Sequence, residues 1–318
     1  MAIVHEKLAI EGGAPVRSAP LPPMFPGGMV IGDAEKQAVL EVLDDKNLFR
    51  FYGPSPTSSR VGRFERRFAE HMGSRYGLAV ASGTAALHTA LVALGIGPGD
   101  EVIVPAYTFI ATASAVIAAK AVPIIAEVDD TLTLDPYDVE RHVTPRTRAI
   151  IPVHMRGAAC DMDRLLTVAR RHGLLVLEDV AQACGASLHG RRLGTFGDIG
   201  AYSLQYHKVI TTGEGGVVLT DDQRLYDRAR IFHDGASAYR GGKEPLTAAV
   251  FPGVNYRMGE LCGALGLVQL DRLEGLLQTM RVRKAQVCAV IAPTLQARGV
   301  QCRRLIDPQG DAAVALIL

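Results

Sequence analysis

A lysine at position 208 stands where an amine could act as a nucleophile. The chain has only seven lysines, and Lys208 is set between an expected apolar strand and the glycine-rich run Gly213–Gly216. Partial burial there would lower the pKa of the amine and leave a neutral fraction at working pH. A solvated surface lysine is the alternative interpretation. His207 is adjacent in sequence, but neighbouring side chains need not face the same way, so it ranks behind Lys208 as a reactive group.

A second segment has the residue types that bind phosphate. Ser82, Gly83 and Thr84 come directly after a predicted strand and directly before a helix rich in alanine and leucine. Backbone N–H groups at a helix start, a glycine that allows close approach and two hydroxyls can together hold a phosphate. The same residues could instead simply cap the helix, and their types alone leave both interpretations open.

Acidic residues follow another apolar strand, Leu174–Leu177. Asp179, next to Glu178 and three residues before Gln182, could stay ionised against a protonated ring nitrogen, which is how proteins strengthen pyridoxal phosphate as an electron sink. A carboxylate that caps the next helix is the alternative. Phe109 could lay its flat face on such a ring, although ordinary core packing would explain it equally well.

Composition and motif content argue against several other functions. The formal net charge is +1 over 318 residues, which predicts no broad nucleic-acid surface. The histidines lack metal-ligand spacing, and no G-x-G-x-x-G or G-x-x-x-x-G-K-[ST] motif indicates a dinucleotide or a nucleoside triphosphate. The five cysteines form no C-x-x-C pair, and neither a secretory signal nor a membrane-spanning tract is evident. We therefore expect free thiols in a cytoplasmic protein.

Short β-branched runs alternate with longer helical stretches, which predicts an α/β fold with a mostly parallel sheet and helices on both faces. One helix is expected to begin with Asp33 as its N-cap. Strands are expected at 78–81, 101–104, 122–127, 149–153, 174–178 and 216–220. Further helices are expected at 61–72, 84–94, 108–119, 162–172, 223–232 and 258–296.

Taken in order, five motifs resemble the DegT/DnrJ/EryC/StrS sugar aminotransferase family of fold-type I pyridoxal-phosphate enzymes. The resemblance covers roughly residues 64–284. Its motifs are S-G-T-A-A-L at 82–87, G-P-G-D-E-V-I-V-P at 97–105, E-D-V-A-Q-A at 178–183, the segment 208–216 and G-V-N-Y-R-M-G-E-L at 253–261. Two places depart from the family pattern, since Met155-Arg156 occupies a place before Gly157 where an aromatic residue is common, and Val209 follows Lys208 where asparagine is frequent.

The resemblance implies that Lys208 holds pyridoxal 5'-phosphate as a Schiff base and shuttles the proton during transamination, while Asp179 pairs with the pyridine nitrogen. It also implies a homodimer with shared active sites. The expected cofactor contacts are Ser82, Gly83, Thr84 and Ser203 at the phosphate, Phe109 on the ring face, Gln182 at the ring hydroxyl and Asn255 at the phosphate of the neighbouring subunit. No metal is expected.

The domain organisation follows from the same reasoning. Residues 1–30, rich in proline, are expected to form an extended arm, 31–255 the large domain that binds pyridoxal phosphate, and 256–318 a linking helix with an incomplete small C-terminal α/β domain. The apolar run Ala312–Leu318 is typical of a buried strand, which could not bury both faces alone. The glycine-rich stretch 233–252 is expected to be a mobile surface loop.

The implied reaction moves an amino group from glutamate or glutamine to a keto-sugar in amino-sugar or natural-product biosynthesis. A nucleotide-linked hexose is favoured because that class of acceptor is larger. A keto-cyclitol of the scyllo-inosose type or an aminohydroxybenzoate-type synthase is the alternative, since Gln205 and the G-E-G-G run resemble such members. A protein that binds pyridoxal phosphate without turnover, such as a regulator, is an alternative of another class.

Overall fold

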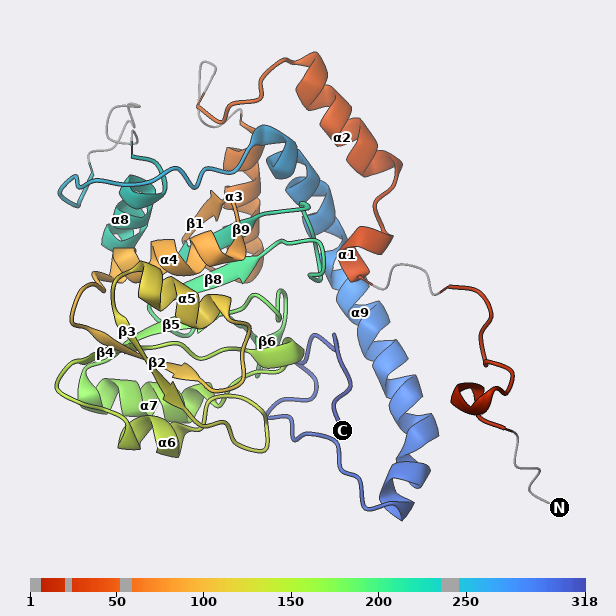
Figure 1. The fold of residues 1–318 in the computed structure, drawn as a ribbon. Helices are drawn as coiled ribbons and strands as arrows, with labels where there is room; N and C mark the ends of the chain where they lie inside the picture. The colour runs from red at the N-terminus through yellow and green to blue at the C-terminus, as the bar shows by residue number, and fades with distance from the viewer. Residues whose placement is uncertain (1–6, 21–24, 52–58, 236–245) are drawn as a thin grey trace.

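A seven-stranded sheet forms the centre of the computed structural model, which describes residues 7–20, 25–51, 59–235 and 246–318 (Figure 1). Its strand order is β1-β9-β8-β5-β4-β2-β3, and β9 alone runs antiparallel to its neighbours. The strands are β1 (Tyr76–Val80), β2 (Glu101–Pro105), β3 (Val122–Ala126), β4 (Thr147–Ile150), β5 (Leu175–Asp179), β8 (Ile199–Ser203) and β9 (Gly216–Thr220). The mostly parallel sheet that the sequence predicts is confirmed.

Helices cover both faces of this sheet (Figure 1). Side chains of one strand alternate between the two faces, so Val217 and Leu219 join one hydrophobic cluster while Val218 joins the other. Helices α4 (Gly83–Leu94), α5 (Ala111–Ala118) and α8 (Gln223–His233) pack on the Val218 side. Helices α3 (Arg60–Met72), α6 (Pro136–Arg141) and α7 (Met162–His172) pack on the opposite side.

The long helix α9 (Glu260–Ala297) packs against α3 and α2 (Asp33–Asp44). Glycines let α9 approach α3 closely, because a Cβ on Gly263 would lie 2.6 Å from the backbone nitrogen of Val61. Glu260 joins the two helices by accepting hydrogen bonds from the backbone nitrogen of Arg60 at 2.6 Å and from the hydroxyl of Ser59 at 2.6 Å. A carboxylate therefore compensates the N–H groups at the start of α3.

Several expectations need correction. Helix α2 has Gly32, not Asp33, as its N-cap, and the backbone nitrogen of Gly32 donates to the carboxylate of Glu35 at 2.9 Å. Residues 312–318 form no strand, because only isolated backbone bonds hold this segment, such as that from Ala312 to Gly157 at 3.0 Å. The apolar strand expected before Lys208 is β8. The sequence patterns missed α6, the short hairpin β6 (Ser187–Leu188) to β7 (Arg191–Arg192), and the short turns η1 (Ala9–Glu11), α1 (Pro26–Met29) and η3 (Met155–Gly157).

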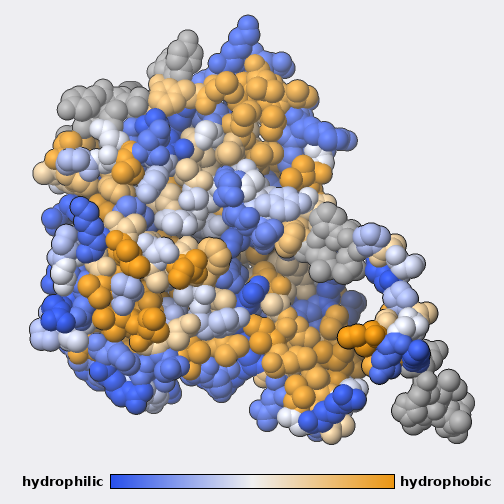
Figure 2. All heavy atoms as spheres, viewed as in Figure 1, coloured by the Kyte–Doolittle hydropathy of each residue, from blue (hydrophilic) through white to orange (hydrophobic). Residues whose placement is uncertain are grey.

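Residues 236–245 of the expected mobile loop lie outside the described part of the chain. Apolar side chains are exposed on α5 and on the edge strand β3, where Figure 2 shows them gathered on the visible face. The exposed apolar residues there are Ile110, Ile117, Val122 and Ile125. Within the described residues, no helix combines the length and the apolar character needed to cross a membrane.

Candidate active site

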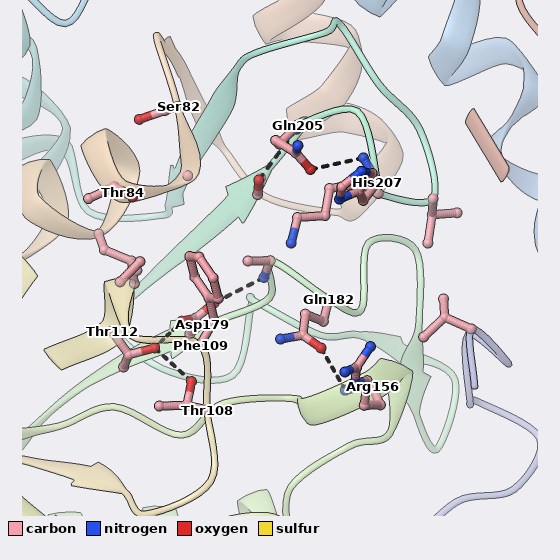
Figure 3. Close-up of a pocket in the computed structure, with 18 of the residues that line it drawn as sticks. Ser82, Thr84, Thr108, Phe109, Thr112, Arg156, Asp179, Gln182, Gln205 and His207 are labelled. Carbon is pink, nitrogen blue, oxygen red and sulfur yellow. Dashed lines mark hydrogen bonds between the residues drawn. The ribbon is translucent and has the colours of Figure 1, made fainter. Parts of the chain in front are cut away.

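A cavity of about 780 Å³ opens at the carboxyl ends of the strands, where open α/β sheets place their ligands (Figure 3). Eight of the nine residues that the sequence nominates for the site line this cavity. They are Ser82, Gly83, Thr84, Phe109, Asp179, Gln182, Ser203 and Lys208. The ninth, Asn255, does not line it. Segments separated by more than a hundred residues are therefore brought together at one edge of the sheet.

Lys208 lies in the turn that follows β8. Its amine has no hydrogen-bond or ion-pair partner among the residues that the structure describes. Burial lowers the pKa of the amine below its ordinary value, and the charge of Arg156 acts in the same direction, against the opposing charges of Asp179 and Glu214. These are the conditions that a nucleophilic amine requires. The alternative of a fully solvated surface lysine is wrong.

Asp179 ends β5 and is only 4% exposed. Its carboxylate accepts hydrogen bonds from the hydroxyl of Thr112 at 2.9 Å and from the backbone nitrogen of Ala181 at 3.0 Å. The Thr112 hydroxyl is also 2.8 Å from that of Thr108, which extends the chain of hydrogen bonds seen in Figure 3. Burial raises the pKa of Asp179, while these hydrogen bonds and the charge of Lys208 oppose the increase. The carboxylate is thus held in a fixed orientation at the cavity wall.

Glu178, the other acid of the pair, faces away from the cavity. It is fully buried and accepts hydrogen bonds from the backbone nitrogens of Gly194, Phe196 and Gly197 at 2.6 to 2.7 Å. His154 Nε2 is 3.0 Å from the same carboxylate. The backbone nitrogen of Cys160 donates to His154 Nδ1 at 3.1 Å, so the ring proton resides on Nε2 and is donated to Glu178. Glu178 thus stabilises the conformation of the 194–197 loop through these hydrogen bonds.

The start of α4 is arranged for both roles that the sequence left open, helix capping and phosphate binding. The Ser82 hydroxyl caps the helix by accepting from the backbone nitrogen of Ala85 at 3.1 Å, and Ser82 also lines the cavity. The first N–H groups of a helix have no intrahelical partner, so those of Gly83 and Thr84 are available to an anion. Gly83 packs directly on Ser203, since a Cβ there would lie 2.7 Å from Ser203 Cβ.

Phe109 is 63% exposed and projects into the cavity, which excludes core packing as its role. Gln182 accepts a hydrogen bond from the backbone nitrogen of Arg156 at 3.3 Å. His207 also lines the cavity, with its ring against that of Phe25 at a centroid distance of 4.0 Å.

Sequence reasoning missed other residues of this wall. They are Thr108, Thr112, Arg156 and Glu214. Met155-Arg156 carried a sequence signal as a departure from the family motif, and Glu214 lies within the motif segment 208–216, while neither threonine was assigned a role.

Asn255 lies on the surface, outside the cavity of its own chain. Its backbone bridges to Asp234, and its side-chain oxygen accepts from the backbone nitrogen of Arg257 at 3.4 Å. Its expected contact with a neighbouring subunit's cofactor stays a prediction.

Comparison with known proteins identifies the family to which the chain belongs. The model of the DegT/DnrJ/EryC1/StrS aminotransferase family matches residues 30–315. The chain belongs to this family. Its aminotransferases depend on pyridoxal phosphate. GDP-perosamine synthase of Caulobacter vibrioides is 47% identical over 224 residues, which are 68% of this chain and 58% of that protein.

Two further members of the aminotransferase family extend the comparison. L-glutamine:2-deoxy-scyllo-inosose aminotransferase of Streptomyces kanamyceticus is 39% identical over 282 residues, which are 86% of this chain and 65% of that protein. The crystal structure of DesI in the presence of its TDP-sugar product has a TM-score of 0.82 and 32% identity, covering 97% of this chain and 74% of that one. The chain spans under two thirds of the length of the two curated relatives.

The residues of the cavity fit pyridoxal phosphate. The aldehyde of the cofactor requires an amine, which Lys208 offers without a partner. The ring nitrogen requires a carboxylate, and that of Asp179 is buried with a fixed orientation. The phosphate requires a helix start, which α4 provides where Gly83 packs on Ser203. Phe109 offers an exposed aromatic face for the ring.

Proposed function

We propose that this protein is a pyridoxal-phosphate-dependent aminotransferase that moves an amino group from glutamate or glutamine to a nucleotide-linked keto-sugar. The observation that carries the proposal is the unpartnered amine of Lys208, with its lowered pKa, in the same cavity as the buried carboxylate of Asp179. Such pairing of an activated nucleophile with a fixed acid is typical of this class of catalyst.

When bound, pyridoxal phosphate supplies an aldehyde and an electron-accepting ring. Lys208, through its neutral amine, would hold the cofactor at the aldehyde with loss of water, and the same amine, when free, would carry the proton at the reacting carbon. Asp179, oriented by Thr112, would stay ionised against a protonated ring nitrogen. The N–H groups of Gly83 and Thr84 would hold the phosphate, with the Ser203 hydroxyl beside them.

The acceptor proposal rests on the relatives. The names of the Caulobacter protein and of the DesI complex include nucleotide-linked sugars, which supports such an acceptor here. The Streptomyces relative supports a keto-cyclitol as the second candidate, because its match extends over 86% of this chain. Cofactor binding without turnover is the remaining candidate, and an assay for amino transfer distinguishes it.

We also propose the homodimer with shared sites. Asn255 is exposed and lies outside its own cavity, which supports a role at the site of a partner subunit. The apolar surface over α5 and β3 supports a protein contact. All five cysteines are free, which agrees with the cytoplasmic location that the sequence favours.

Hydride trapping tests the proposal at one residue. After treatment with borohydride, mass spectrometry should place the cofactor's added mass on the peptide that contains Lys208, and the visible absorption band should disappear. Lys208→Ala should lack both signals and retain its circular dichroism, whereas Lys36→Ala, at an exposed lysine paired with Asp33, should keep them. Added mass on another peptide, or none, would refute the assignment.

The acceptor is tested by amino transfer from glutamate and from glutamine to purified keto compounds. Nucleotide-linked keto-hexoses and scyllo-inosose serve as the two competing acceptors. Preferential amination of the cyclitol would replace the first candidate with the second. Trapped cofactor with no transfer to either class would favour binding without turnover.

A further inference from the structure

Arg156 has a backbone conformation that residues other than glycine rarely adopt. Its φ is 53° and its ψ is 38°, in the left-handed region, and the next residue, Gly157, has a φ of 87°. Residues other than glycine pay a steric penalty in this region, and such residues cluster at functional sites. The strain at Arg156 therefore persists only because its surroundings hold it.

Four hydrogen bonds hold the backbone around Arg156. Its nitrogen donates to the side chain of Gln182 at 3.3 Å, and its carbonyl accepts from Arg303 Nη2 at 3.0 Å. Arg303 Nη1 donates to the preceding carbonyl, that of Met155, at 2.7 Å. The carbonyl of Gly157 accepts from the backbone nitrogen of Ala312 at 3.0 Å. Segments from three parts of the chain thus fix where the Arg156 side chain begins.

The Arg156 side chain lines the cavity on the same side as Gln182 (Figure 3). Its guanidinium has no hydrogen-bond or ion-pair partner among the residues that the structure describes. It is close enough to Lys208 that its charge adds to the effect of burial in lowering the pKa of the amine. The cavity therefore presents a planar cation, without a hydrogen-bond or ion-pair partner among the described residues, near the reactive amine.

We propose that Arg156 is a specificity-determining residue that binds the α-carboxylate of the amino donor. This inference rests on the proposed function. An α-amino acid carries its carboxylate on the carbon that bears the transferred amine, so an anion must lie one bond from the reacting centre, beside Lys208. A guanidinium matches a carboxylate through two parallel hydrogen bonds. The phosphates of a nucleotide-linked sugar are attached at a different ring carbon from the ketone and so bind farther from Lys208.

The experiment uses a donor analogue that binds without completing the reaction. α-Methyl-L-glutamate lacks the proton that must be removed, and its binding is followed by the change in the visible absorption band of the cofactor-loaded protein. The matched probe is the same compound with its α-carboxylate converted to a carboxamide. The variants are Arg156→Met, Arg156→Lys and, as a control on the exposed surface of α7, Arg170→Met.

We expect the unsubstituted protein and Arg170→Met to bind the carboxylate at least roughly tenfold more tightly than the carboxamide, as for a paired charge. Arg156→Met should bind both probes with similar affinity, and Arg156→Lys should regain part of the difference. All variants should keep the hydride-trapped mass at Lys208.

Two results would overturn the inference in distinguishable ways. If Arg156→Met shows the normal absorption band and still prefers the carboxylate as strongly as the unsubstituted protein, Arg156 does not bind this group and the proposed function stands. If the unsubstituted protein shows neither the band nor the trapped mass, the proposed function fails and the inference fails with it.

Discussion

Substituting Gly83 by alanine tests how tightly the site is packed. Gly83 is the first residue of α4, and its φ is not in the left-handed region. Alanine in a helix gains up to about 1 kcal/mol over glycine, so the local effect alone would stabilise the protein. A Cβ at this position, however, would lie 2.7 Å from the Cβ and 2.9 Å from the Oγ of Ser203. Ser203 is buried in β8 between two other strands and cannot move aside.

Overpacking of a rigid core costs about 1–3 kcal/mol, which exceeds the gain in helix propensity. We therefore expect Gly83→Ala to lower the free energy of unfolding by about 1–2 kcal/mol. Urea denaturation followed by circular dichroism measures this change. Gly275→Ala in α9 is the control, because a Cβ there meets no atom within 4 Å and should stabilise the helix.

Ser203 is the residue that a Cβ at position 83 would contact, so substituting it tests the cause of the destabilisation. In a double-mutant cycle, Ser203→Gly should relieve most of the cost of Gly83→Ala, whereas Ser203→Ala should not, because the clash with its Cβ remains. A Gly83→Ala variant as stable as the unsubstituted protein would show that the two segments separate freely. A cost that is the same in all three Ser203 backgrounds would show that the clash with Ser203 does not cause it.

Two further predictions concern buried carboxylates. Both oxygens of Glu178 accept hydrogen bonds, so the amide NH2 of a Glu178→Gln variant must face hydrogen-bond donors. We expect the free energy of unfolding, measured by urea denaturation, to fall by about 1–3 kcal/mol. An unchanged denaturation midpoint would contradict this prediction. Burial alone would raise the pKa of Glu35, but hydrogen bonds from Arg272, Gly32 and Gln269 lower it from 4.5 to about 2. Because a pKa lowered on folding gives stability that is lost as pH falls, Glu35→Gln should flatten the decline in unfolding free energy between pH 4.5 and 2; an unaltered slope would refute this role.

Much of the fold could be predicted because its signals are local. Helix α7 was expected at its observed bounds, since its apolar residues recur at helical spacing and Gly173 ends it with a φ of 65°. Strand β8 was expected before Lys208, but its bounds could not be given because its sequence contains Gly200, a weak strand former. That glycine is required by the tertiary packing, since a Cβ there would lie 2.4 Å from the carbonyl oxygen of Gly194.

The site was predicted to the extent that its residue types carry their own chemistry. A lysine beside a glycine-rich turn, an acid after an apolar strand and a serine-glycine-threonine start of a helix are recognisable before any fold is known. The roles of the two neighbouring acids could not be separated in this way. Alternation along the end of β5 sends Asp179 to the cavity and Glu178 to the 194–197 loop, and only the packed sheet shows which is which.

By itself, the sequence determined the alternation of strands and helices and the reactive residues at the strand ends, because periodicity and side-chain chemistry act over a few neighbouring positions. The tertiary structure decided what surrounds those residues. The hydroxyl that orients Asp179 comes from Thr112, 67 positions away, and the arginine that holds Arg156 in its strained conformation is 147 positions away. Burial, hydrogen-bond orientation and the pKa of Lys208 depend on such distant contacts, which exist only once the sheet has assembled.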